Sequence, residues 1–326
     1  MMLLVLAIQP QRILGQDPSF SQFYSNPLYL NPALAGTGDC SRVLFNYRNQ
    51  WPSMPGNFVT YSASADHYVN ALSGGIGVII SSDNAGKGMM NTTRLSAIYS
   101  YHLKLSYDVS LNAGFNATFH QQKIKSDDLI YRDMIDPVSG AINPGNTGEV
   151  PIDNPTVNTA DFSLGLALGI KEKYFVGFAV DHVTQPVLTY YENSENNLLY
   201  RKFTAHAGVR INLSSNRYSR NEDGFILSPN ILYQQQQHAR QLNGGLYVEK
   251  SPIITGIWYR HTLENPDGVI FLLGIKQKRF KFGYSYDLTL SKLKGTTGGA
   301  HEVSLAILVG CNKKRNKPGA IKCPEF

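Results

Sequence analysis

Apolar and polar residues alternate with a period of two along most of this chain, from about residue 41 to residue 310. In the clearest stretch, Phe162 to Ile170, large apolar residues occupy every second position, with serine, glycine and alanine between them. Because successive side chains of a strand point to opposite faces of a sheet, this pattern is typical of β-strands. No stretch in this region keeps the 3.6-residue period of an amphipathic helix, so the pattern predicts an all-β fold.

The polar face of these strands decides between a soluble sandwich and a membrane barrel, since the strands of both alternate. A water-exposed face would be rich in Lys and Glu, whereas here it is mostly Gly, Ser, Ala, Asn and Thr. Charged residues make up 17% of the chain, below the roughly 25% of ordinary soluble domains. The isolated charges on this face are Arg48, Arg94, Asp181, Arg210, Lys281 and Glu302. Unlike charges can pair across a polar lumen, so we predict that the apolar face contacts lipid and the polar face lines a barrel interior.

Two further features favour a membrane barrel. Aromatic residues gather near predicted strand ends, as in girdles at the two membrane interfaces. The pairs are Tyr99 and Tyr101, Trp258 and Tyr259, and Tyr284 and Tyr286. The longest uninterrupted apolar stretch, Leu3 to Ile8, is far short of the roughly 20 residues that a membrane-spanning helix needs. This excludes a helical membrane protein.

The connections between strands give an independent test, because bacterial outer-membrane barrels alternate short periplasmic turns with long external loops. We place strands near residues 41–49, 57–69, 73–83, 90–103, 107–120, 158–170, 173–183, 200–213, 223–236, 239–250, 252–263, 268–277, 279–289 and 299–310. With a periplasmic N-terminus, the long connections 121–158, 184–199 and 289–298 all lie outside the cell. The tight turns near Lys104, Glu172, Ser251 and Lys278 all lie in the periplasm. The exceptions are a longer periplasmic connection at 214–223 and a short external one near Gln237. The sequence therefore predicts a transmembrane antiparallel β-barrel of about fourteen strands.

The segments outside the barrel are expected to have separate roles. Residues 1–15 are predicted to be a signal peptide, because a short apolar run ends in a small residue that permits cleavage before Gln16. The alternative is a disordered tail. Residues 16–40 form an N-terminal periplasmic or plug-like segment, residues 41–310 the barrel, and residues 311–326 a basic periplasmic tail. The tail is more suited to acidic lipid, peptidoglycan or a periplasmic protein than to nucleic acid.

Three cysteines, Cys40, Cys311 and Cys323, lie too far apart for a metal site. The first and last strands of a closed barrel are neighbours, so Cys40 and Cys311 both fall at the periplasmic rim and can bridge. A bridge between Cys311 and Cys323 is equally compatible with the sequence, and an exported chain can oxidise either pair.

The sequence contains no motif of an enzyme. It lacks a G-x-S-x-G elbow, a Walker loop and an H-E-x-x-H pair. The glycines of Gly74 to Gly77 lie inside an alternating strand, where they are expected to relieve crowding rather than hold a phosphate. The histidines are dispersed over different strands rather than clustered at ligand spacing. We therefore expect no catalytic residue, no cofactor, no metal and no nucleic-acid partner.

The two ends of the mature chain carry its sharpest motifs. These are Phe20-Ser21-Gln22-Phe23-Tyr24, Asn31-Pro32-Ala33, Gly36, Tyr47-Arg48, Gln50-Trp51 and the ending Cys323-Pro324-Glu325-Phe326 after His301-Glu302-Val303-Ser304-Leu305. With these motifs the chain resembles the PorP/SprF family of type IX secretion and gliding-motility outer-membrane proteins.

The resemblance implies a barrel related to the fatty-acid transporter FadL in the bacterial outer membrane. It also implies a plug-like N-terminal segment, and a role in secreting or holding surface adhesins with the type IX machinery. The residues that it marks as a partner or plug segment are Asn31, Pro32, Ala33, Gly36, Arg48, Gln50 and Trp51. Trp51 suits either a recognition surface or, as we favour, an interface anchor. Some relatives are fused to or work beside a peptidoglycan-binding OmpA-like domain. None occurs in this sequence, so we expect any tie to the cell wall to come from a periplasmic partner or the tail.

Our leading hypothesis is a binding protein whose external loops, chiefly 121–158, contact a cognate surface adhesin while its periplasmic end meets the secretion machinery. The alternative is a FadL-like channel for a small solute. The charges expected on the lumen face argue against a hydrophobic solute but not against a polar one.

Overall fold

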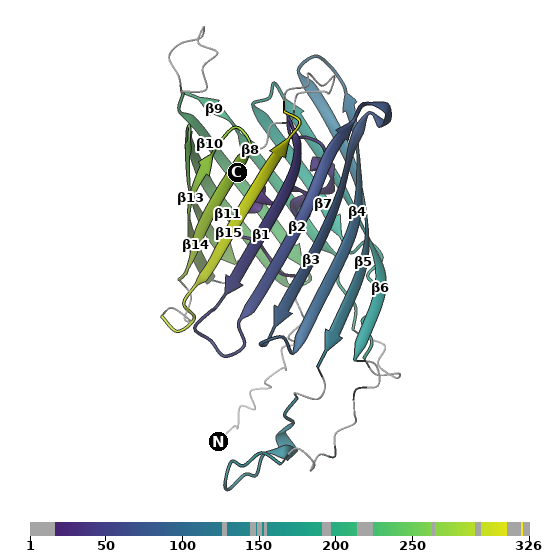
Figure 1. The fold of residues 1–326 in the computed structure, drawn as a ribbon, viewed down its shortest axis with the longest axis vertical. Helices are drawn as coiled ribbons and strands as arrows, with labels where there is room; N and C mark the ends of the chain where they lie inside the picture. The colour runs from purple at the N-terminus through teal and green to yellow at the C-terminus, as the bar shows by residue number, and fades with distance from the viewer. Residues whose placement is uncertain are drawn as a thin grey trace, which may run out of the picture.

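The chain folds into a closed antiparallel β-barrel (Figure 1). The computed structural model describes residues 17–125, 129–143, 148, 152, 155–190, 197–213, 224–262, 265–290, 295–311 and 321. The strands in this part are β1 (Ser41–Gln50), β2 (Phe58–Val69), β3 (Gly74–Ala85), β4 (Met90–Lys104), β5 (Val109–Ile124), β6 (Thr156–Ile170), β7 (Tyr174–Asp181), β8 (Lys202–Val209), β9 (Ile211–Asn212), β10 (Ile226–Gln236), β11 (Ala239–Lys250), β12 (Ile253–Thr262), β13 (Asn265–Lys276), β14 (Phe280–Thr289) and β15 (Ala300–Val309).

These strands make a barrel of fourteen positions, as the sequence predicts. Arg210 alone separates β8 from β9, and both pair with β10, so together they occupy one position. The barrel closes where β1 pairs with β15 from Ser41 opposite Val309 to Gln50 opposite Ala300. The predicted strand boundaries are correct to within a few residues.

The alternation has the predicted physical meaning. In β6 the side chains of Phe162, Leu164 and Leu166 are exposed on the outside of the barrel, while Ser163 and Gly165 face the interior and are buried. The predicted aromatic girdle is wrong at Trp258, whose side chain is fully buried inside the barrel. Its neighbours Ile257 and Tyr259 are the exposed ones, so strand parity turns the indole inward.

The connections differ between the two ends of the barrel. One end has the short turns, such as the one from Ile170 to Tyr174, and the other has the long loop from Ile124 to Thr156, seen below the barrel in Figure 1. Because outer-membrane barrels keep their long loops outside, we call these the inner end and the outer end. Among the described residues, short 3-10 helices lie in two connections, η3 (Asn70–Leu72) at the inner end and η5 (Arg132–Met134) in the long outer loop.

Residues 17–40, which we call the plug segment, lie inside the barrel rather than beside it. The segment contains η1 (Phe23–Ser25), α1 (Pro27–Leu30) and η2 (Pro32–Leu34). From Phe20 to Gly36 every residue except Tyr29 is buried. The segment starts near the outer end, where the backbone N–H of Asp17 donates to the Gln236 Oε1 atom at 3.0 Å. It reaches the inner end at Cys40, directly before β1, so it crosses the lumen lengthwise. No helix in the described residues is long and apolar enough to cross a membrane.

An aromatic core joins the plug segment to one wall of the barrel. The Trp258 ring lies 5.0 Å from that of Phe23 and 5.6 Å from that of Tyr247, centroid to centroid. Ile321 belongs to the same buried cluster, so one residue of the predicted tail reaches the barrel interior. Aromatic pairs in such edge-on geometry add about 0.5–1.5 kcal/mol beyond burial of their area.

A disulfide bond joins Cys40 to Cys311 at the inner end, with their Cα atoms 4.6 Å apart. It therefore links the end of the plug segment to the residue that follows the last strand. Cys323, the other partner considered for Cys311, lies outside the described residues.

Candidate functional site

Asn31 makes the central contacts between the plug segment and the barrel wall. This fully buried side chain donates from its Nδ2 atom to the carbonyl oxygens of Leu166 in β6, at 3.0 Å, and Phe178 in β7, at 3.3 Å. Its Oδ1 atom accepts from the backbone N–H of Ala33 at 2.9 Å and so caps η2. The amide thus fixes the plug segment to two strands while satisfying its own helix.

Glycines on the lumen face make room for this contact. A Cβ atom added to Gly165 would lie 2.1 Å from the Asn31 Oδ1 atom, and one added to Gly114 would lie 2.3 Å from the Ala33 nitrogen. The predicted strand glycine Gly75 has the same role, since its Cβ would lie 2.1 Å from the Ala35 oxygen. Side chains at these positions would overlap the plug segment, its backbone at Gly114 and Gly75 and its side chains at Gly165.

Near the inner end, the plug segment ends on a buried ion pair. Arg42 of β1 contacts both carboxylate oxygens of Asp66 in β2, at 2.8 and 2.6 Å. The same carboxylate accepts from the Gly36 backbone N–H at 2.7 Å, and Arg42 also donates to the Leu34 carbonyl at 3.1 Å. Gly36 has φ +72°, and a Cβ atom there would lie 2.6 Å from the Cα atom of Gly75. Both observations explain why residue 36 is a glycine.

A second charged cluster holds the plug segment at Ser21 and Gln22. Glu302 of β15 accepts from the backbone N–H groups of Ser21, at 2.6 Å, and Gln22, at 3.1 Å. Arg48 of β1 lies 3.2 Å from Glu302 and 3.2 Å from Asp287 of β14, and it also donates to the Ser21 hydroxyl. Charge-assisted bonds of this kind are stronger than neutral ones, so this cluster binds the plug backbone firmly.

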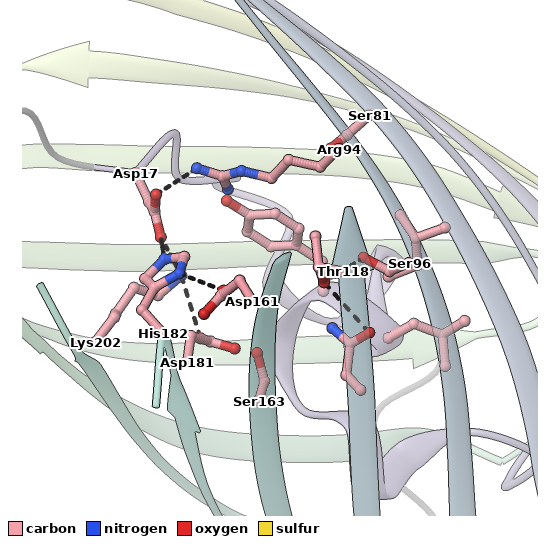
Figure 2. A pocket seen from close by; sticks show the side chains of 14 residues that line it. Asp17, Ser81, Arg94, Ser96, Thr118, Asp161, Ser163, Asp181, His182 and Lys202 are labelled. Atoms are coloured by element: carbon pink, nitrogen blue, oxygen red, sulfur yellow. Dashed lines mark hydrogen bonds and ion pairs between the residues drawn. The ribbon is translucent and has the colours of Figure 1, made fainter. Parts of the chain in front are cut away.

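A third cluster lies at the outer end around Asp17 (Figure 2). The Asp17 carboxylate contacts Arg94 of β4 at 2.5 Å, His182 Nε2 at 2.6 Å and Lys202 of β8 at 3.9 Å. Burial alone would raise the pKa of the Asp17 carboxyl, but these three cationic side chains outweigh burial and hold that pKa well below its usual range. Beside the cluster is a cavity of about 40 Å³, lined by both polar and apolar side chains. This is room for a few water molecules, not for a sugar or a fatty acid.

Comparison with known proteins decides the family. The model of the type IX secretion system membrane protein PorP/SprF family matches residues 13–307. The chain belongs to the PorP/SprF family. Membership and the closed barrel together place the protein in the bacterial outer membrane and associate it with type IX secretion.

Solved structures of other outer-membrane barrels resemble this PorP/SprF chain in fold. The monoaromatic hydrocarbon channel CymD matches with 10% identity over 87% of this chain and 92% of its own, at a TM-score of 0.47. The Pseudomonas putida toluene transporter TodX matches with 9% identity over 86% and 91%, at 0.46. A Pseudomonas aeruginosa FadL homologue matches with 13% identity over 85% and 92%, at 0.44. No curated protein matches this chain significantly.

The residues singled out from the PorP/SprF motifs fall into two places. The structure brings Asn31, Pro32, Ala33 and Gly36 together in the lumen as part of the plug segment. Arg48, Gln50 and Trp51 follow the β1 wall to the outer end. Gln50 Oε1 accepts from Arg48 at 3.4 Å, and the Trp51 backbone N–H donates to the Gly299 carbonyl at 2.8 Å. The Trp51 ring packs on Phe58, 5.6 Å away, at the outer rim.

Sequence reasoning missed the outer cluster. It places Arg94 and Asp181 on the lumen face, but it gives no role to Asp17 and treats His182 as an ordinary histidine. The feature available in the sequence is the carboxylate of Asp17 in the segment expected to plug the lumen, but nothing in the sequence names its partners. In the described residues no group of His, Cys, Asp and Glu has the geometry of a metal site.

The long outer loop contains an ordered hairpin, residues 129–143. Ile135 bridges to Ile142, and the Asp136 side chain accepts from the backbone N–H groups of Val138 and Ser139 at the tip, at 2.9 and 2.7 Å. The Val138 side chain is 95% exposed and that of Ile142 50%. The hairpin therefore exposes branched apolar side chains at the outer end of the barrel.

Proposed function

We propose that this protein is a non-enzymatic binding component of type IX secretion that helps to secrete or anchor a cognate surface adhesin. The observation that carries the proposal is the filled lumen. The plug segment crosses it, hydrogen-bonds to both sides of it, and leaves beside the outer cluster a cavity of only about 40 Å³. A barrel closed in this way is suited to present its two ends to other proteins.

The outer end carries the proposed adhesin contact. Exposed branched apolar residues at the tip of an ordered hairpin favour protein binding, since function is commonly placed on loops held by a rigid scaffold. The inner end would meet the secretion machinery, outer-membrane phospholipid and a periplasmic peptidoglycan-binding protein.

Deletion of the gene tests the proposal. We expect one type IX cargo to be lost from the cell surface while the others are displayed normally. Normal display of every cargo in the deletion strain would disprove it.

Replacement of Val138 and Ile142 by serine tests the contact itself. We expect the cognate adhesin to be released into the medium while the barrel stays at its normal level in the outer membrane. Met54→Ser is the matched control, because Met54 is also an exposed apolar residue of an outer connection but lies outside the hairpin. An equal effect of both variants would contradict a specific role for the hairpin.

The channel alternative requires a passage through the lumen. The contacts of the plug segment oppose such a passage, and the charged side chains of the outer cluster oppose a hydrophobic solute. Uptake of a defined small solute by liposomes that contain the purified protein would favour this alternative.

A further inference from the structure

The outer cluster brings three cationic side chains of the barrel to one carboxylate of the plug segment. Arg94 from β4, and His182 and Lys202 from the neighbouring ends of β7 and β8, converge on Asp17 (Figure 2). All of these side chains are nearly buried, with at most 12% of any one exposed. The plug is held independently further along, by Asn31 on β6 and β7 and by Glu302.

The protonation of His182 follows from its geometry. Its Nε2 atom lies 2.6 Å from the Asp17 carboxylate, and its Nδ1 atom lies 2.6 Å from the carboxylate of Asp161 in β6. Ionised carboxylates only accept hydrogen bonds, so both ring nitrogens must donate and the ring is a cation. Asp161 is a fixed part of the wall, whereas Asp17 arrives with the plug.

Lys202 and Arg94 differ in whether an ion-pair partner would remain if Asp17 were absent. Lys202 keeps Asp181 at 3.6 Å as a second partner. Arg94 has Asp17 as its only ion-pair partner in the described residues, and its Nε atom otherwise donates to His120 at 3.3 Å. Removal of the Asp17 carboxylate would leave a buried guanidinium unpaired, which is strongly unfavourable. The wall therefore requires a carboxylate at this point, whichever molecule supplies it.

Space for such a group is present. The cavity beside Asp17 has a hydroxyl-rich lining that includes Ser81, Ser96, Thr118 and Ser163. His120 is only 2% exposed, and its Nε2 atom has no hydrogen-bond partner in the described structure. Together with the volume of an absent Asp17 side chain, this cavity accommodates an anion the size of formate or acetate.

We propose that Arg94, His182 and Lys202 form a carboxylate-binding site at the outer end of the lumen. Asp17 occupies this site in the closed barrel, and a small monocarboxylate from solution occupies it when the Asp17 carboxylate is absent. The site is a property of the barrel wall and does not depend on the proposed adhesin contact.

Chemical rescue tests the site. The full chain with Asp17→Ala is refolded, and its thermal unfolding midpoint is measured against increasing formate or acetate at constant ionic strength. We expect the midpoint to be lower than that of the wild-type protein and to rise with either anion to saturation. Formamide and acetamide, which have similar shapes but no charge, should have no effect, and the wild-type midpoint should not respond to formate.

Two outcomes would overturn the proposal. One is an Asp17→Ala midpoint that does not change with formate or acetate. The other is an equal rise in the double variant Asp17→Ala/Arg94→Gln, which would mean that the anions act elsewhere. If Asp17→Ala does not refold alone, the folded fraction replaces the midpoint as the readout. Formate should then restore folding where formamide does not, and the absence of restoration by formate would equally overturn the site.

Discussion

At the scale of single residues, charged side chains that are buried but paired hold the plug segment in the lumen. Arg48 lies between Glu302 and Asp287, and its side chain is only 4% exposed. A buried charge is tolerated when partners and hydrogen bonds replace water, and here two backbone N–H groups of the plug also donate to Glu302. Breaking such a cluster should cost much more than breaking a pair at the surface.

Arg48→Met tests this difference. It removes the cation paired with the buried Glu302 carboxylate, while Asp287 keeps Arg260 at 2.8 Å, so we expect the free energy of unfolding to fall by about 3–5 kcal/mol. The matched control is Lys276→Met, which breaks the more exposed pair with Glu249 and should cost about 1 kcal/mol or less. Urea unfolding of the refolded proteins in lipid vesicles measures both. Similar losses in the two variants would show that Arg48 does not hold the plug.

Gly165→Ala tests the close approach of the plug to the wall. The added methyl would overlap the Asn31 side chain at 2.1 Å, so we expect a loss of about 1–3 kcal/mol in the free energy of unfolding. Gly244→Ala is the control, because nothing lies within 4 Å of its Cβ position, and it should change the stability by less than about 0.5 kcal/mol. The same urea titration applies. If the Gly165 variant were as stable as the wild-type protein, this close contact between Asn31 and β6 would be refuted.

The sequence predicts some of these residues and not others, for a physical reason. Arg48 and Glu302 stand out because a charge on the small-residue face of a strand needs a partner, and their pairing across β1 and β15 follows from closure of the barrel. The pairing of Asp17 with Arg94 and His182 joins the plug to strands far along the chain. No period or spacing in the sequence encodes that contact.

At the scale of elements, the strands follow directly from the sequence because their signal is local. Most lipid-facing positions are apolar, with exceptions such as His67, Arg240 and Thr255, so the register of most strands can be predicted residue by residue. Trp258 shows the limit of this reasoning. An aromatic residue beside Tyr259 suggests a girdle, yet parity sends one of two adjacent side chains inward, and the inward one packs on Phe23 of the plug. Composition alone does not tell which of the two it is.

The disulfide bond between Cys40 and Cys311 gives a prediction at this scale. It spans 271 residues of sequence, so replacing both cysteines by serine should lower the free energy of unfolding by about 2–5 kcal/mol, mainly by releasing the unfolded chain. A matching loss is expected when the wild-type protein is reduced. Cys323→Ser is the control and should leave the stability unchanged. Peptide mapping without reductant should recover Cys40 linked to Cys311, and a peptide that links Cys311 to Cys323 would contradict the structure.

At the scale of the whole molecule, the barrel and its plug segment form one closed body. The plug touches opposite walls, through Asn31 on β6 and β7 and through Ser21 on β15. The disulfide bond ties its last residue to the end of the barrel. The lumen is therefore part of the packed core, and the two ends are the surfaces left for other proteins.

Ion conductance across a planar bilayer tests this closure most directly. We expect the full chain, inserted in the bilayer, to give no stable channel current, and a variant that lacks residues 17–36 to give current steps because the lumen has lost its filling. Stable current steps from the full chain, similar to those of the shortened variant, would contradict a barrel closed by its own N-terminal segment.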